Sequence, residues 1–192
     1  MRKFFILIIL LCTACEHKLP AHREIKFQDN NFVMFKAKEL EIIFNHNKNL
    51  IQDNIGDKSY VTLKKAVEKW VHARIKVSGE DIRILKIVVK DAKIIKTEML
   101  DQESGLKSLL TKPMEVYKAE LEVALEFYLP ESLFPNNVMT ISANCTKSLQ
   151  KGASLDERDQ LFYDIAQQLI AAIDVEFNKN VNVYLGELVT YF

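Results

Sequence analysis

Alternation of apolar and polar residues, which is typical of strands with one buried face, predicts four β-strands in this chain. These strands are residues 39–44, 82–97, 120–129 and 138–149. The third alternates most regularly, with apolar residues at the odd positions and mainly glutamate at the even ones. The second loses its alternation at Asp91 and Ala92, which predicts a bulge or bend at that point.

Apolar residues at helical spacing predict two helices. The first spans residues 59–77 and ends before Gly79, a residue suited to a left-handed helix stop. The second begins at Ser154, because Ser154 and Glu157 have the spacing of a capping box. Its apolar residues recur every four positions over residues 161–181, so the helix extends to residue 180 or beyond.

The order of these elements predicts the fold class. A strand, a helix, three strands and a second helix follow one another, and the connections between the last three strands are short. We therefore expect an α+β fold, with two helices packed on one face of a roughly four-stranded, mainly antiparallel sheet. Residues 32–192 form this single domain.

The first 14 residues have the pattern of a signal peptide. Arg2 and Lys3 precede a short apolar run, Phe4–Leu11, and small residues follow it. A transmembrane helix needs about 20 apolar residues, and this run is much shorter. The pattern therefore predicts a secretory signal.

The residues Thr13, Ala14 and Cys15 resemble the lipobox of bacterial lipoproteins. In that pattern a leucine usually stands three residues before the lipidated cysteine, and Cys12 occupies this place here. The resemblance implies that Cys15 receives a diacylglycerol, carries fatty acyl chains such as palmitate and becomes the new N-terminus. The alternatives are an ordinary secretory signal cut near Ala14, or an apolar N-terminal segment of the core.

Residues 15–31 then form a lipidated N-terminus and a polar tether. The 16 residues from Glu16 to Asn31 are mostly polar and contain Pro20, and fully extended they reach at most about 50 Å. Two or more acyl chains anchor a protein stably, whereas one chain alone is marginal. In the sorting rule of enteric lipoproteins, Asp directly after the lipidated cysteine favours the inner membrane, whereas Glu16 resembles the class that is permitted to reach the outer membrane, which is therefore the favoured site.

The charge balance argues against nucleic-acid binding, and the cysteine content argues against an internal disulfide. The chain has 26 basic and 26 acidic residues, without the basic excess of a nucleic-acid-binding protein. With Cys12 removed and Cys15 acylated, Cys145 is the one remaining thiol, so no internal disulfide forms. Cys145 follows the apolar alternation of its strand and is expected to be buried, and Trp70 is expected in the core of the first helix.

We expect no catalytic, metal-binding or cofactor-binding residues. The four histidines are scattered, at positions His17, His22, His46 and His72. No phosphate-binding loop or nucleophile elbow is present in the sequence. Two groups of carboxylates have structural explanations. Asp156, Glu157 and Asp159 lie at the start of the second helix, where the macrodipole favours negative charge. Glu120, Glu122 and Glu126 form a solvated strand face that pairs with Lys86, Lys90 or Lys93.

A lipobox, a polar tether and a small α/β domain that ends in a Ser-capped long helix resemble envelope-transport lipoproteins of Gram-negative bacteria. Two such groups are the lipopolysaccharide-assembly lipoproteins and the auxiliary lipoproteins of phospholipid ABC transporters. The resemblance implies a non-catalytic adaptor on the periplasmic face of a membrane, bound to a larger envelope protein and not to nucleic acid. The alternative is a periplasmic carrier that holds a lipid or other apolar ligand between helices and sheet.

Overall fold

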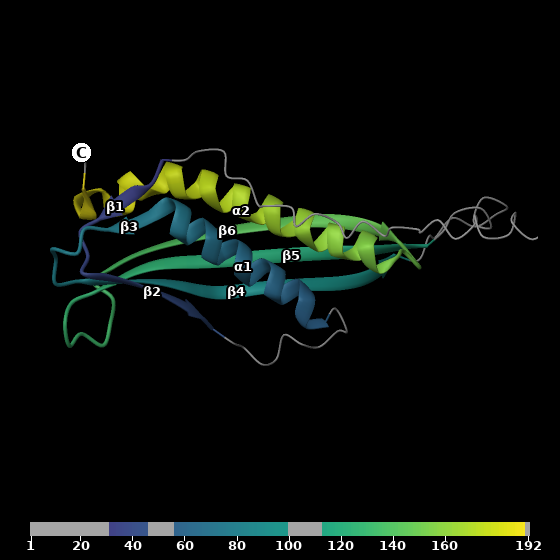
Figure 1. The fold of residues 1–192 in the computed structure, drawn as a ribbon, viewed down its shortest axis with the longest axis horizontal. Coiled ribbons are helices and arrows are strands. Elements are labelled where there is room, and N and C mark those ends of the chain that lie inside the picture. Colours follow the sequence, from purple (N-terminus) through teal and green to yellow (C-terminus); the bar gives the residue numbers. More distant parts are fainter. Residues whose placement is uncertain (1–30, 46–55, 100–112, 191–192) are drawn as a thin grey trace, which may run out of the picture.

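The computed structural model describes residues 31–45, 56–99 and 113–190. The predicted signal peptide (residues 1–14), the lipidation site (Cys15) and the predicted tether up to residue 30 lie outside these residues. Within them, two helices lie along one face of a long sheet, as the sequence predicts (Figure 1). None of the helices in this part of the chain is apolar enough over a sufficient length to cross a bilayer.

The larger sheet has four strands in the order β2-β4-β5-β6. Their bounds are Glu39–Phe44 for β2, Ile84–Met99 for β4, Met114–Tyr128 for β5 and Asn137–Gln150 for β6. The β4–β5 and β5–β6 pairs are antiparallel, but β2 runs parallel to β4. The prediction of a mainly antiparallel arrangement is therefore corrected to a mixed sheet. The reason is that the connection from β2 to β4 contains helix α1, Gly56–Arg74, which allows the chain to enter β4 in the same direction.

A second, three-stranded sheet was not predicted. Its order is β3-β1-β7, with β1 at Val33–Phe35, β3 at Ile75–Val77 and β7 at Val189–Thr190. β1 pairs parallel with β3 and antiparallel with β7, so this sheet is mixed as well. The predicted first helix is corrected at both ends: it begins at Gly56, and its last three expected residues form β3.

The predicted irregularity in β4 is confirmed as a register shift between Val89 and Asp91. Before the shift the odd-numbered residues of β4, Leu85, Ile87 and Val89, are buried against the helices. After it, the even-numbered Ala92 and Ile94 take that side, opposite Leu121 and Ala119 of β5. One bulged residue thus keeps the apolar side chains on one face although their sequence parity changes.

Helix α2, Leu155–Leu185, is 31 residues long and covers β6, whereas α1 lies on β4. Its predicted capping box is present: the backbone N–H of Glu157 donates to Ser154 Oγ over 3.3 Å, and the backbone N–H of Ser154 donates to Glu157 Oε2 over 2.7 Å. A short 3₁₀ turn, η4 at Gly186–Leu188, follows α2 and leads into β7.

Side chains fill the space between the helices and the sheet. Trp70 of α1 meets Phe177 of α2 edge-to-face at 5.5 Å between ring centroids. Phe35 of the small sheet meets Phe127 of β5 at 5.6 Å, which joins the two sheets in one core. Trp70, Phe35, Phe127 and Phe177 are all fully buried.

Candidate functional site

The sequence-predicted site, Cys15, lies outside the described residues together with His17, His22 and His46. Of the four histidines, the structure describes His72, which is exposed in the last turn of α1. Over residues 31–45, 56–99 and 113–190, no group of three His, Cys, Asp or Glu side chains is arranged as metal ligands would be.

Two of the three glutamates on the predicted solvated face of β5 form ion pairs across the sheet, as expected. Glu120 Oε2 lies 2.7 Å from Lys93 Nζ, and Glu126 Oε1 lies 3.7 Å from Lys90 Nζ. The hydrogen bond to Glu120, followed by the one to Asp91, raises the pKa of Lys93 above its ordinary value. These contacts account for two of the three glutamates as parts of a charge ladder.

Cys145 and Trp70 are both core residues, as predicted. Cys145 is 6% exposed on β6, and burial raises the pKa of its thiol above the ordinary value, so the unreactive thiol form is favoured. Trp70 is fully buried, and its indole N–H donates a hydrogen bond to Asp174 Oδ1 over 2.8 Å.

A polar cluster between the helices, centred on two buried charged residues, was not predicted from the sequence. Arg74 of α1 is 2% exposed; its Nε donates to Asp174 Oδ1 over 2.7 Å and its Nη2 donates to Asn178 Oδ1 over 2.6 Å. Arg74 lies one turn after the buried Trp70, and Asp174 lies within the apolar stripe of α2. The sequence signal for this cluster was one charged residue within the apolar stripe of each helix, Arg74 in α1 and Asp174 in α2. Arg74 and Asp174 are buried and Asn178 is exposed at the edge of the cluster, which we assign to helix packing.

A second polar cluster surrounds Glu115, which is 2% exposed at the start of β5. Lys96 Nζ donates to Glu115 Oε1 over 2.7 Å, and the Tyr117 hydroxyl donates to Glu115 Oε2 over 2.7 Å. The hydrogen bond from Lys96 lowers the pKa of Glu115, while burial and then the hydrogen bond to Glu115 raise the pKa of Tyr117 to about 12. Arg158 of α2 lies 3.6 Å from the same carboxylate, so the cluster joins α2 to the sheet.

The most unusual surface feature is the hairpin tip, residues 129–136, which connects β5 to β6. Leu133 is 88% exposed and Phe134 is 77% exposed, the two highest values among the large apolar residues of the described chain. In Figure 1 this connection, drawn in green, extends past the end of the sheet and away from both helices. From the sequence, these residues are expected only as a short connection between two predicted strands.

Hydrogen bonds join residues within the hairpin tip. At its base, the backbone N–H of Asn136 donates to the Phe127 carbonyl over 2.8 Å, and the Asn136 side-chain oxygen accepts from the Leu129 N–H over 3.2 Å. At its apex, Ser132 Oγ donates to the Phe134 carbonyl over 2.6 Å. Leu133 and Phe134 are exposed in this hydrogen-bonded conformation of the loop.

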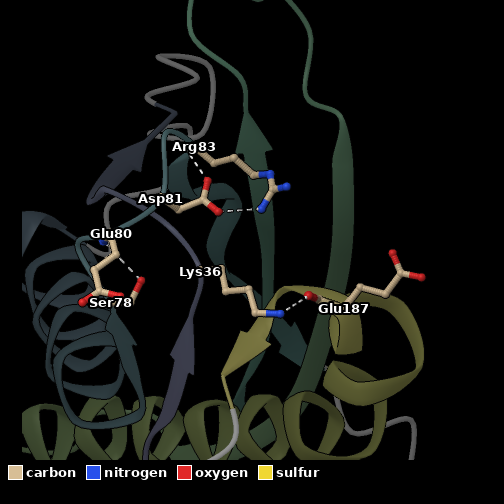
Figure 2. Close-up of polar contacts among 6 residues, drawn as sticks. All are labelled: Lys36, Ser78, Glu80, Asp81, Arg83 and Glu187. Carbon is tan, nitrogen blue, oxygen red and sulfur yellow. Dashed lines mark hydrogen bonds and ion pairs between the residues drawn. The ribbon is translucent and has the colours of Figure 1, made fainter.

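The segments beside the hairpin are also fastened by polar contacts (Figure 2). Asp81 Oδ1 accepts from the backbone N–H of Arg83 over 2.9 Å, and its Oδ2 forms an ion pair with the Arg83 guanidinium at 3.0 Å. Lys36 Nζ donates to the Glu187 carbonyl oxygen over 2.9 Å, whereas the Glu187 carboxylate points away from Lys36 in Figure 2. Ile82, in the connection between β3 and β4, adds a further apolar side chain that is 63% exposed.

A shallow open depression lies near the start of α2, at the other end of the molecule from the hairpin tip. Its lining residues are Leu149, Asp156, Glu157, Gln160, Leu161 and Asp164. Three of these six are acidic, so the apolar floor has a negatively charged rim.

Comparison with known proteins gives likeness at the level of solved structures only. No protein-family model matches the chain, and no curated protein matches it in sequence.

Several similar solved structures are bacterial lipoproteins. A minor lipoprotein from Acinetobacter baumannii is 11% identical, with a TM-score of 0.38 over 82% of this chain and 99% of that one. The rare lipoprotein B from Shewanella oneidensis is 8% identical, with a TM-score of 0.36 over 76% and 98%. An uncharacterized lipoprotein B from Nitrosomonas europaea is 13% identical, with a TM-score of 0.34 over 84% and 96%.

Proposed function

We propose that this chain is a non-catalytic lipoprotein of the bacterial envelope, tethered to a membrane through Cys15, that acts as an adaptor for a larger envelope protein. The outer membrane is the favoured site, with the domain on its periplasmic face. The larger protein belongs to a transport or assembly system, such as lipopolysaccharide assembly or phospholipid ABC transport. The N-terminal sequence pattern supports the tether.

The observation that carries the adaptor role is the hairpin tip. A contact protein needs an exposed apolar surface, and contiguous exposed apolar patches mark sites of contact with proteins, membranes or ligands. Leu133 and Phe134 are held in water by a loop whose hydrogen bonds fix its shape. Such a surface is suited to contact with another molecule.

The alternative, a carrier, needs room for an apolar ligand between helices and sheet. The side chains that would line this space contact one another: Trp70 packs on Phe177, and Tyr117 packs on Phe162 at 5.8 Å between ring centroids. Ile165, Leu169 and Ile173 of α2 are fully buried against the sheet. This packing favours the adaptor over the carrier.

The adaptor and carrier hypotheses are separated by what accompanies the full, processed chain when it is purified from crosslinked membranes. We expect a protein partner in stoichiometric amount, identified by mass spectrometry, and no non-covalent lipid in native mass spectra of the released chain. Stoichiometric lipid on the purified chain, with no protein partner recovered, would contradict the adaptor function.

A further inference from the structure

We propose that the hairpin tip is the part of this protein that enters its partner: Leu133 and Phe134 fill an apolar pocket in another protein, and Glu131 pairs with a basic side chain at the rim of that pocket. The proposal rests on the adaptor function proposed above and names the surface and the chemistry of the partner that it fits.

The conformation of the tip is already suited to binding. Glu131 has a positive φ of 62°, a region that side chains other than glycine rarely adopt. The bond from Ser132 Oγ to the Phe134 carbonyl and the bonds at Asn136 hold the chain around this residue. Strained backbone of this kind persists only where the surrounding structure fixes it, and it is concentrated at functional sites. A loop that is already ordered loses little conformational entropy on binding.

The size of the apolar surface fits a pocket. Leu133 and Phe134 are adjacent in sequence and 88% and 77% exposed, so nearly all of both side chains is available for burial. A few central side chains supply most of the binding energy in protein interfaces, and aromatic anchors in desolvated pockets are prominent among them. Two large side chains on a narrow loop match such a pocket better than a flat surface.

The charge of the tip distinguishes a protein pocket from a bilayer. Glu131 is exposed and is the one charged residue in residues 129–136. Within the described part of the chain, its carboxylate has no hydrogen bond or ion pair. Amphipathic helices that bind membrane surfaces are rich in Lys and Arg on their polar face, whereas this tip would bring an unpaired carboxylate to the lipid. A basic side chain of a protein partner complements it.

Site-specific photo-crosslinking in cells tests where the partner binds. A photoreactive amino acid is placed at Phe134 or, as a matched control, at Leu155, which is 73% exposed at the start of α2 and far from the tip. We expect one discrete protein adduct from position 134 and none from position 155. Equal adducts from both positions, or none from 134, would overturn the assignment of the tip.

Affinity measurements on the full chain and the protein identified by that adduct test the chemistry. Leu133→Ser with Phe134→Ser should weaken binding at least about 30-fold, the size of a hot-spot loss. Leu155→Ser should leave binding unchanged. The three proteins should have the same melting temperature because the replaced side chains are exposed. A weakening below about 3-fold for the double variant, with the fold intact, would refute the apolar anchor.

Glu131 is tested by the same measurement. We expect Glu131→Lys to weaken binding about 10-fold or more, mainly through slower association. Glu131→Gln should weaken binding less, and the affinity of this variant should depend less on salt than that of the unaltered chain. Glu187→Lys is the matched control, since Glu187 is an exposed glutamate at the same end of the molecule. Tighter binding of Glu131→Lys would mean that the rim of the pocket is acidic and would reject this part of the proposal.

Fluorescence of an environment-sensitive dye tests whether the tip contacts a bilayer. The dye is attached at position 134 of the lipidated chain, which is bound to phosphatidylethanolamine–phosphatidylglycerol vesicles, and its emission wavelength is measured. We expect no blue shift until the partner is added. A blue shift on vesicles alone would overturn the protein-pocket proposal in favour of membrane contact.

If the partner is recovered equally with and without the tip substitutions, the adaptor function stands and the tip assignment fails. If the unaltered chain recovers no partner, the adaptor function itself fails.

Discussion

Arg74 Nε lies 2.7 Å from Asp174 Oδ1, so a buried ion pair joins α1 to α2. The same Asp174 oxygen accepts the indole N–H of Trp70, and the Arg74 Nη2 also reaches Asn178. Burying two charges is costly unless each is paired and hydrogen-bonded, and here the partners come from both helices. The pair therefore links α1, the crossover between β2 and β4, to the long helix of the domain.

Replacing Asp174 by Ala should destabilise the fold by about 3–5 kcal/mol, because the Arg74 guanidinium would remain buried without its carboxylate. The free energy of unfolding from urea titration measures this loss. Replacing both members, Arg74→Met with Asp174→Leu, should recover most of it, leaving about 1 kcal/mol for the unpaired Trp70 N–H. A loss below 1 kcal/mol for Asp174→Ala would show that solvent reaches the guanidinium and that the pair is not buried in solution.

The Arg74–Asp174 pair also illustrates what sequence can and cannot predict. Long regular patterns, such as the alternation of β5 and the four-residue repeat of α2, predict their elements because one face of each is buried along its whole length. The strands β1, β3 and β7 have two or three residues each, which is too short for any period to be recognised. Which buried charges meet depends on how α1 and α2 are placed side by side, and periodicity carries no information about that.

The candidate site shows the same limit. Leu133 and Phe134 stand between two prolines, and that composition predicts a turn without stating which way its side chains point. The loop conformation that exposes them contains the hydrogen bonds of Ser132 and Asn136, which are visible only in the folded structure. The parallel pairing of β2 with β4, in contrast, was available from the sequence, because a helix of this length between two strands usually returns the chain to a parallel strand.

Ser154 should contribute about 1 kcal/mol as the N-cap of α2. In Ser154→Ala the backbone N–H of Glu157 loses the hydroxyl that it reaches over 3.3 Å. Thermal unfolding followed by circular dichroism measures the effect, with Ser148→Ala, an exposed serine on β6, as the matched control. Equal melting temperatures for the two variants would count against the capping box as a source of stability.

Glu115 should make stability depend on acid. Its pKa is lowered in the folded state, chiefly by the hydrogen bond from Lys96, so the unfolded chain binds this proton more tightly. The stabilisation is therefore complete above the unfolded pKa and is lost as the pH falls through the folded one. We expect the urea midpoint to fall between pH 7 and pH 3, and Glu115→Gln to reduce that fall. Glu120→Gln, at a more exposed ion pair, should keep the slope of the unaltered protein; an unchanged slope in Glu115→Gln would contradict the assignment.

If the chain is a non-catalytic adaptor, its cellular function should not depend on any single titratable side chain outside the hairpin tip. Glu122→Gln, Asp159→Asn and His46→Asn remove a charge or a possible ligand at three separate places. Each should leave the phenotype of a complemented deletion strain nearly unchanged at equal protein level. Loss of function in one of them, with the fold and the protein level intact, would reopen the search for a catalytic or metal-binding site around that residue.

Cys15 should be the lipid attachment point, because it alone follows a small-residue pair after the apolar run of the signal. Cys15→Ser should leave the chain unprocessed or release it into the soluble periplasmic fraction, whereas Cys12→Ser should be processed and remain on the membrane. Fractionation with metabolic labelling by a palmitate analogue distinguishes these outcomes. The two substitutions also separate tether from tip: a Cys15→Ser protein keeps Leu133 and Phe134, so it should still bind the isolated partner in solution while failing to complement in cells. Recovery of a processed, labelled Cys15→Ser protein from membranes would instead place the anchor at another residue, and the tether of residues 15–31 would have to be redrawn.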